Sequence, residues 1–443
     1  MFQYDDEYIL TEVYSAFEPF RPPDKDTYVD FESVRGRWNV SRELGRRITR
    51  SKMATCQLFS GHRGVGKTTE LLRLKEELEG KKYHVVYFAA DEQDIEPQDT
   101  EYADILLSCT RHLVQEIVID GQNPVVRWLN DRWGEFKEFA LSDIEFDKLT
   151  LQQKLGAFGQ INANVRAVPQ IRGQVRSEMN KHTVSLVQAL NEFIEMAQTK
   201  LKGEGKKGIV VVADNLDRIV EVRDEKGRSN HDQIYLDRSE QMSGINCHVI
   251  YTVPISFLCS DRATQIGNLY DRDVLPMVMV RNEDGSRNEA GMEKFRELVK
   301  RRVRKVDPQL AEVMDTEIFE SAEVLDRLCY MSGGHLRILM QMVQKAIDWT
   351  DTLPISQQAV HSAISEMRKT YIDTIQADWW EALARVHQTK QIKKDDLHHL
   401  FLLNRCVLEY REMGEDGELK DWYDVHPTIE QIDKFKKILA SPD

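Results

Sequence analysis

The stretch FSGHRGVGKTTELL, residues 59–72, places three glycines, a lysine and two threonines directly before a segment with helical apolar periodicity. Gly61, four intervening residues, Gly66, Lys67 and Thr68 complete the pattern G-x-x-x-x-G-K-[ST]. Glycines let backbone N–H groups point inward at phosphate oxygens, and the following helix adds the positive end of its dipole. The apolar run CQLFS precedes the loop, and this strand–loop–helix context predicts a nucleoside-triphosphate site.

ATP with Mg²⁺ is the ligand expected at this phosphate-binding loop (P-loop). The Lys67 ammonium would reach the β- and γ-phosphates, and the Thr68 hydroxyl would bind Mg²⁺. A chance glycine-rich turn is the alternative, and the complete pattern in its expected context speaks against it. The residues expected to surround the nucleotide are Gly61, Gly64, Val65, Gly66, Lys67, Thr68 and Thr69.

A second chemical motif is GIVVVADNLD, residues 208–217, an apolar run that ends in acids. A carboxylate at the end of a neighbouring strand holds the water shell of the metal, so Asp214 is the predicted metal acid. Asp217 is the candidate base that orients the attacking water, and the alternative is that it caps the next helix. Asn215 stands where many ATPases of this type carry a catalytic glutamate, which indicates slow hydrolysis.

Further candidates follow from position in the chain. Thr252 ends an apolar run that would lie between the two phosphate-binding strands, where it could sense the γ-phosphate; the alternative is a strand-end threonine before Pro254. Arg337, in SGGHLR, could reach the nucleotide from a lid, or it is a surface helix arginine. Arg262 and Arg272 are candidates for an arginine that acts on a neighbouring subunit, although an ordinary surface residue is the favoured alternative for each.

The segment YVDFESVRGRW lies upstream of the P-loop. Its residues Phe31, Val34 and Gly36 could form an adenine pocket. A plain packed loop explains the same residues equally well.

Five apolar runs alternate with helical patterns, which predicts a parallel sheet covered on both faces. The fold class expected is therefore α/β, with a five-stranded parallel sheet of the P-loop NTPase type, a helical lid and a C-terminal winged-helix domain. The five runs are residues 56–60, 83–91, 208–217, 247–254 and 274–280.

Four domains are expected along the 443 residues. An N-terminal segment on the adenine side covers 1–50, and the ATPase core covers 51–289 with a helical insertion at about 98–202. A helical lid covers 290–370. Residues 371–443 read as a winged helix, because the helical DDLHHLFLLN is followed by CVLEYR, a polar turn and WYDVHP.

The net charge of -14 argues against a chain that coats nucleic acid or an anionic membrane non-specifically, although a local basic patch could still bind either one. Six scattered cysteines form no Cys-x-x-Cys pair, so neither a zinc site nor a disulfide framework is suggested, and buried thiols in a reducing cytosol are expected. The acidic start MFQYDDEY is unlike a signal peptide, and no run approaches the length of a membrane span. A cytoplasmic location without membrane contact is expected.

Taken together, the motifs resemble the AAA+ and STAND-type P-loop ATPases over roughly residues 30–430. ADNLDR looks like the acidic strand ending of NACHT and KAP-type NTPases, whereas the lid and winged helix look more like origin-recognition ATPases and relatives in prokaryotic conflict systems. The chain departs from ordinary AAA+ enzymes at Asn215 and lacks the long repeat array of full STAND sensors.

The leading hypothesis is an ATP-dependent homo-oligomeric switch that controls a separate effector protein, with prokaryotic antiviral defence as the role that family analogy implies. A DNA-binding ATPase of replication initiation or transposition is the alternative, and a nucleotide-binding scaffold without activity is a third. Lys393 and Lys394 stand beside Asp395 and Asp396, which disfavours DNA contact. Protein contacts are expected instead from the hairpin, where some apolar side chains must form the domain's own core and the remainder could anchor a partner or a neighbouring subunit. The set is Val407, Leu408, Tyr410, Trp422 and Tyr423.

Overall fold

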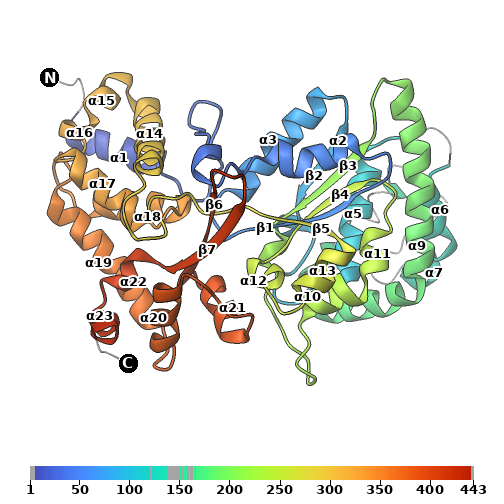
Figure 1. Cartoon of the computed structure of the whole chain (residues 1–443). Coiled ribbons are helices and arrows are strands. Elements are labelled where there is room, and N and C mark those ends of the chain that lie inside the picture. The colour runs from blue at the N-terminus through green and yellow to red at the C-terminus, as the bar shows by residue number, and fades with distance from the viewer. Residues whose placement is uncertain are drawn as a thin grey trace. The chain divides into compact units, whose positions relative to one another are not determined.

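A computed structural model describes residues 5–119, 122–136, 150, 153–154, 156, 159, 163–164 and 166–440 of the chain (Figure 1). The chain divides into two units. The sheet unit comprises Val40–Ser60 and Glu70–Val274, and the helical unit comprises Met1–Asn39, Gly61–Thr69 and Leu275–Asp443. Among the described residues, no helix combines the length and apolar character needed to cross a lipid bilayer.

The sheet unit is built on five parallel strands in the order β2-β3-β4-β1-β5. All six residues of β3 are buried, as expected for a strand covered on both faces. Strand β4 lies between β3 and β1, as the sequence predicts. The strands are β1 Cys56–Ser60, β2 His84–Ala89, β3 Ile209–Asp214, β4 His248–Thr252 and β5 Asp271–Val274.

The prediction of a strand over residues 274–280 is wrong. The fifth strand, β5, ends at Val274 and pairs with β1 through polar residues, so it carries no apolar signal. The chain after it belongs to the helical unit, where Met277 N–H donates to Glu409 O (3.0 Å) and Met279 N–H donates to Val34 O (2.9 Å). Its residues are apolar because they are buried in a core, and a short apolar run does not reveal which partner covers it.

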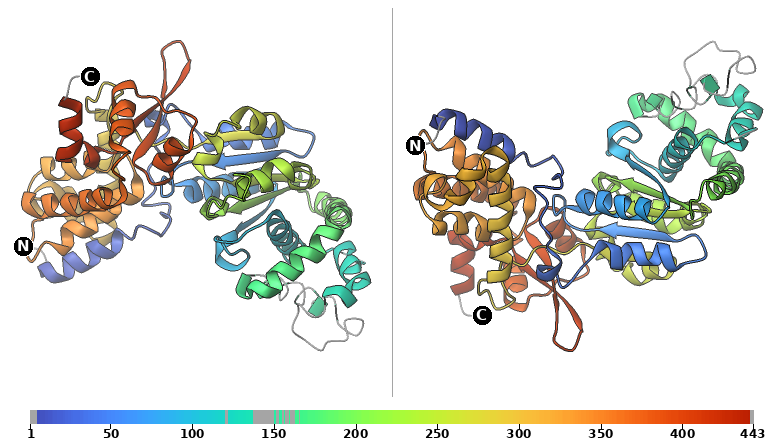
Figure 2. Two further views of the ribbon diagram at one scale, coloured as in Figure 1. Left: turned by 90° about the horizontal axis from the view of Figure 1, so that it is seen from below. Right: turned by 90° about the horizontal axis from the view of Figure 1, so that it is seen from above.

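Helices cover the sheet and build the insertion. Helix α5 (Tyr102–Glu116) packs on β2 and β3, and the 35-residue α9 (Pro169–Gly203) packs on α5 and α6 (Figure 2). Part of the predicted insertion, chiefly residues 137–149, lies outside the described residues. The other helices here are η2 Ser41–Gly45, α2 Arg46–Arg50, α4 Ala90–Gln93, α6 Pro124–Asp131, α7 Trp133–Phe136, η5 Leu216–Arg218, α10 Asn230–Asp232, η6 Gln233–Asp237, α11 Ser239–Ser243, α12 Ile255–Leu258 and α13 Ala263–Leu269.

The helical unit has its own core, which α14 (Glu289–Val306), α17 (Ala322–Met331), α18 (Leu336–Asp348) and α19 (Gln357–Thr374) form together with α1 (Asp6–Ala16). Each of these helices buries an apolar stripe at helical spacing, such as Phe295 and Val299 of α14. The smaller helices of this part are η1 Glu32–Val34, α15 Pro308–Glu312 and α16 Met314–Glu317.

The C-terminal part has the order of a winged helix, in which helices precede an antiparallel hairpin. Val407 pairs with Val425, and the hairpin continues to the pair Met413 and Leu419. The predicted fold class, a five-stranded parallel sheet with a helical lid and winged helix, is thereby confirmed. The elements are α20 Trp380–Thr389, α21 Asp396–Leu403, β6 Val407–Met413, β7 Leu419–Val425, α22 Pro427–Glu430 and α23 Asp433–Ala440.

The hairpin residues predicted to anchor a partner are mostly core residues. Val407, Leu408, Tyr410 and Trp422 are fully or almost fully buried, and the Tyr410 and Trp422 rings stack with centroids 4.2 Å apart. Only Tyr423 is partly exposed. These side chains are large and apolar because a small domain needs them for its own interior, so they do not form an exposed contact surface.

Candidate nucleotide-binding site

The P-loop backbone adopts conformations that favour glycine. Gly61, Gly64 and Gly66 have φ of 144°, 91° and 107°. A Cβ atom on Gly64 would also lie 2.7 Å from both Arg337 Cβ and His335 Cε1, so a side chain would collide there as well. The glycines of the motif are therefore required by the local conformation and, at Gly64, by the close approach of residues from the lid.

Lys67 is the first residue of α3 (Lys67–Gly80) and is only 6% exposed. Its ammonium Nζ donates to two P-loop carbonyls, Gly61 O at 2.8 Å and His62 O at 3.1 Å. The buried cation is thus held over the loop that precedes the helix. Thr68 and Thr69 follow in the first turn of α3, where backbone N–H groups lack helical partners.

Three successive P-loop carbonyls accept hydrogen bonds from other segments of the helical unit. His335 Nε2 donates to Arg63 O (2.8 Å), and the Arg337 backbone N–H donates to Gly64 O (3.3 Å). Arg35 Nη2 donates to Val65 O (2.7 Å). The P-loop is therefore fixed through its carbonyl groups by both the lid and the segment upstream of it.

Arg337 lies where the lid meets the P-loop, which makes it more than a surface helix arginine. Its backbone contacts Gly64, while its guanidinium Nε donates to Pro19 O (3.3 Å) and its Cζ lies 4.9 Å from the Phe20 ring centroid. The side chain thus extends along the N-terminal segment, and its role toward a nucleotide remains a proposal.

Asp214 ends strand β3 in the sheet unit, and both of its carboxylate oxygens accept hydrogen bonds. The Asn215 backbone N–H donates to Oδ1 (2.7 Å), and the Tyr87 hydroxyl donates to Oδ2 (2.8 Å). Burial and the adjacent carboxylate raise the pKa of Tyr87, so the hydroxyl keeps its proton. The carboxylate is therefore oriented from β2, the strand beside it.

Thr252 is fully buried at the end of β4 and is connected to the turn that follows Asp214. Its hydroxyl oxygen accepts the Leu216 backbone N–H at 2.9 Å. Asp217 lies in the short helix η5 and is 5% exposed, and Asn215 is the N-cap of that helix. The next helix, α10, has Ser229 and not Asp217 as its N-cap. Thr252 and the acidic turn thus form one connected group in the sheet unit.

The remaining candidates have ordinary structural contacts. Arg262 Nε lies 3.5 Å from Asp232 Oδ2, and Arg272 Nη1 donates to Ala263 O (3.0 Å). In the proposed adenine segment, Phe31 and Val34 are buried in the core of the helical unit, where the Phe31 ring packs edge-on against Phe295. The plain packed loop is the interpretation that these contacts support.

Four contributors to this region were not predicted from the sequence: Arg35, His62, Tyr87 and His335. Tyr87 lies in an apolar strand, and His335 occupies an N-cap position where Ser, Thr, Asp or Asn is usual. His62 fills an unspecified position of the P-loop pattern. Of the four, only His335 could have been noticed in the sequence, as an unusual cap residue after two glycines. The others act through side-chain contacts with residues far along the chain, and such contacts leave no local sequence pattern.

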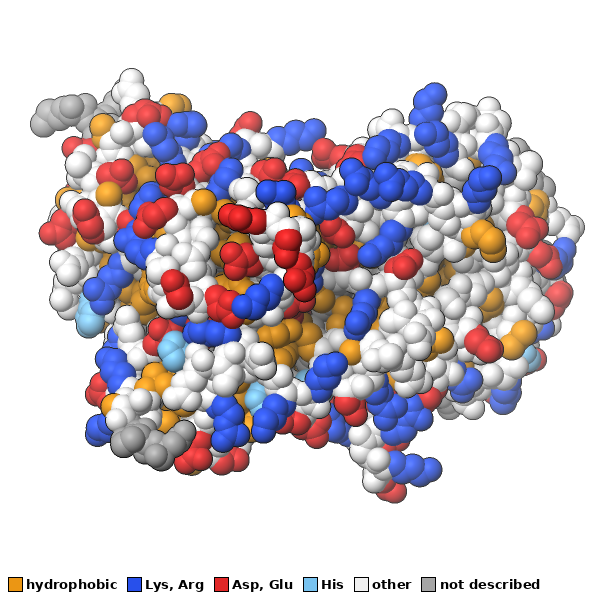
Figure 3. Space-filling model, viewed as in Figure 1, with side chains coloured by type: hydrophobic (Ala, Val, Ile, Leu, Met, Phe, Trp, Pro, Cys, Tyr) orange, Lys and Arg blue, Asp and Glu red, His pale blue; other side chains and the backbone are white. Residues whose placement is uncertain are grey.

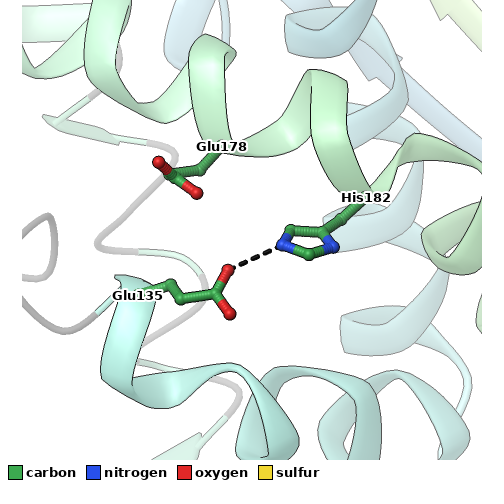
Figure 4. Close-up of side chains that lie close together, drawn as sticks. All are labelled: Glu135, Glu178 and His182. Carbon is green, nitrogen blue, oxygen red and sulfur yellow. Dashed lines mark hydrogen bonds and ion pairs between the residues drawn. The ribbon is translucent and has the colours of Figure 1, made fainter.

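Groups with metal-ligand chemistry also occur away from the P-loop. In the sheet unit, Glu178 and His182 of α9 point toward Glu135 of α7, and His182 Nε2 lies 2.6 Å from Glu135 Oε2 (Figure 4). Glu178 pairs with Lys181 at 2.7 Å, so ion pairs explain this partly exposed group. In the helical unit, Arg281 and Lys390 already neutralise the group formed by His387, Asp424 and Glu430.

Comparison with known proteins finds no matching protein family and no matching curated protein. Two solved structures are similar at 12% sequence identity. ORC2 of Aeropyrum pernix, solved as ADPNP–ADP complexes, has a TM-score of 0.39 over 90% of each chain. CDC6P from Pyrobaculum aerophilum has a TM-score of 0.38 over 96% of this chain and 97% of that chain. Likeness of this degree carries no argument about function, which rests on the residues of this chain.

Proposed function

We propose that the chain binds ATP with Mg²⁺ and hydrolyses it, as an ATPase of the AAA+ type. The observation that carries the proposal is the P-loop, whose three glycines have positive φ and whose buried Lys67 opens a 14-residue helix. A loop of this kind before a helix N-terminus is a phosphate site, because it offers N–H groups, a dipole and a cation together.

The residues of this chain fit magnesium as well as the nucleotide. Thr68 supplies a hydroxyl and Asp214 a carboxylate, the oxygen ligands that Mg²⁺ prefers. Strands β1 and β3 run parallel with β4 between them, so their carboxyl ends share one sheet edge, and the P-loop leaves β1 after Ser60. When bound, Mg²⁺ would neutralise charge on the β- and γ-phosphates.

For hydrolysis, we propose Asp217 as the base that orients water and Thr252 and Arg337 as groups that respond to the γ-phosphate. The Thr252 hydroxyl accepts a hydrogen bond from the Leu216 backbone N–H, in the turn that carries Asp214 and Asp217. A structural change at either acid would therefore be transmitted to β4. Asn215 occupies the usual position of a catalytic glutamate, and the proposed hydrolysis is accordingly slow.

Steady-state phosphate release tests these roles. Asp217→Asn should keep nucleotide affinity and lower the hydrolysis rate about 10²–10⁴-fold, because the water loses its base. Asp224→Asn, on the exposed turn after η5, is the matched control and should behave as wild type. Hydrolysis at the wild-type rate by Asp217→Asn would place the base elsewhere.

We propose that the protein uses the nucleotide as a switch that controls a separate effector protein. In this proposal the chain forms a homo-oligomer, and Arg262 or Arg272 acts on the nucleotide site of the neighbouring subunit. These parts rest on the resemblance and on the absence of a second catalytic motif in the sequence. No contact among the described residues bears on antiviral defence.

A DNA-binding ATPase of the replication-initiation type is the second candidate. The winged-helix order of α20, α21 and the hairpin favours it over antiviral defence. The hairpin itself is unsuited to phosphate contact, because segment 411–421 carries five acidic and two basic side chains (Figure 3). Arg411 pairs with Asp421 (2.6 Å), and Lys420 pairs with Glu283.

Any DNA contact would therefore have to avoid the hairpin tip. We expect weak affinity that falls steeply with salt, measured by fluorescence anisotropy on duplex DNA. Nanomolar, sequence-selective binding at physiological salt would instead promote the initiator function to first place.

A further inference from the structure

Two buried histidines contact the P-loop region in opposite hydrogen-bonding roles. His335, the N-cap of α18, accepts the Ile338 N–H through Nδ1 (3.2 Å) and donates through Nε2 to Arg63 O (2.8 Å). His62 accepts the backbone N–H of Glu409 through Nε2 (3.1 Å). Both rings are neutral in these roles, since each uses one nitrogen as an acceptor.

The first histidine helps to fix the direction in which P-loop N–H groups point. The carbonyls of Arg63, Gly64 and Val65 all accept hydrogen bonds from surrounding segments. In a planar trans peptide the next N–H points opposite to the carbonyl, so the N–H groups of Gly64 and Gly66 are directed away from those donors. Those are the groups that a phosphate would contact.

The second histidine connects the same loop to the C-terminal hairpin. Glu409 lies in β6, and its neighbour Tyr410 donates from its hydroxyl to Gly333 O (2.7 Å), just before the His335 cap. Leu408 also packs at Gly333, where an added Cβ would lie 2.6 Å from Leu408 Cδ1. Strand β6 therefore contacts both the P-loop and the turn that carries the lid histidine.

We infer that His335 and His62 are positioning residues of the nucleotide site, and that they couple occupancy of the P-loop to the lid helix α18 and the hairpin strand β6. The inference rests on the proposed nucleotide binding. It makes the winged helix a part that responds to the nucleotide. The hairpin would then change its exposure when phosphate enters the P-loop.

The two functions of His335 can be separated by amide substitutions. His335→Asn keeps an acceptor near the Nδ1 position and so preserves the cap, but it cannot reach Arg63 O. His335→Gln keeps a donor near the Nε2 position and loses the cap. Loss of one neutral hydrogen bond corresponds to about 2- to 10-fold in affinity.

We expect His335→Asn to weaken ADP·Mg²⁺ binding by about 2- to 10-fold in calorimetry while lowering the melting temperature less than His335→Gln does. His335→Gln should lower the melting temperature and keep the affinity. If affinity follows melting temperature in both variants, His335 is merely structural and the inference is wrong.

Hydrogen exchange of the full chain tests the coupling to the hairpin. ADP·Mg²⁺ should slow exchange in residues 407–413 of wild type and of His62→Gln, whose side-chain oxygen replaces the Nε2 acceptor. His62→Leu should not show this slowing even at saturating ADP·Mg²⁺. An equal response in His62→Leu would contradict the coupling.

Exchange without nucleotide separates this inference from the proposed function. His335→Asn should speed exchange at residues 63–66 in the nucleotide-free protein, and unchanged exchange there would refute the positioning role. If His335→Asn speeds exchange at residues 63–66 as expected but the wild type binds no nucleotide, the proposed function fails. The inferred coupling to nucleotide then fails with it. If wild type binds nucleotide and His335→Asn binds equally well, the positioning inference alone is overturned.

Discussion

Asn215 shows how a single backbone conformation accounts for a departure from the usual ATPase pattern. The residue has φ of 64° and ψ of 9°, in the left-handed region that Asn tolerates better than other residues with a side chain. Its backbone N–H donates to Asp214 Oδ1 at 2.7 Å. A glutamate would be disfavoured by this turn, which gives the absence of the usual base a conformational reason.

Tyr87 offers a test of how Asp214, the proposed metal acid, is positioned. Tyr87→Phe removes the donor to Asp214 Oδ2 without changing the shape of the ring. We expect the Mg²⁺ concentration for half-maximal phosphate release to rise by about 10-fold or more, since loss of the group that orients a metal ligand typically weakens metal affinity by about 10- to 100-fold. Tyr83→Phe, at the start of the same apolar run, is the control, and an equal effect there would refute the role of Tyr87.

Buried neutral histidines predict acid sensitivity. Burial, with Lys67 and Arg405 nearby, lowers the pKa of His62 to about 3, and burial likewise lowers that of His426 to about 3. Each group binds a proton in the unfolded chain below about pH 6.5 but not in the folded one, so stability falls as pH drops from there toward 3. At about pH 5.5 each histidine lowers the free energy of unfolding by about 1 kcal/mol.

Urea unfolding at about pH 7 and pH 5.5 measures this loss. His62→Gln removes one titrating group and keeps its acceptor, so it should lose less stability than wild type over that interval. A loss equal to that of wild type would mean that His62 does not contribute.

At the scale of elements, the sequence predicted the strands that are rich in apolar residues. Runs such as HVVYFA and IVVVAD became β2 and β3, and the P-loop context predicted the start of α3 at Lys67. The edge strand β5 is short and polar, so it could not be recognised. The P-loop pattern likewise carried no information on His335 or Arg35, which approach it from far along the chain.

The glycine turn before α18 is a second element that can be tested. Gly334 has φ of 79°, and an added Cβ would lie 1.8 Å from Val278 O. Gly334→Ala should destabilise the chain by more than about 2 kcal/mol in urea unfolding, because a backbone atom blocks the methyl group. Gly417→Ala is the control, since its φ of 83° is similar but no atom lies within 4 Å of the added Cβ, and an equal loss in both variants would refute the clash.

At the scale of the whole molecule, the net charge of -14 and the acidic hairpin disfavour strong phosphate-backbone binding, whereas the proposed P-loop site would bind a small phosphate ligand locally. The cation that the proposal requires is Lys67, which is buried and donates to the carbonyls of its own loop. A phosphate can replace those carbonyls as the partner of the ammonium.

Isothermal titration calorimetry with ATP·Mg²⁺ on wild type, Lys67→Ala and Lys75→Ala tests this central claim most directly. Lys75 lies on the same helix and is partly exposed beside Glu79, so its loss should leave affinity unchanged. Removal of Lys67 should weaken binding by roughly 10²-fold or more, since charge-assisted contacts to phosphate are lost. Equal affinity for all three proteins, or no binding by wild type, would contradict the assignment of the P-loop.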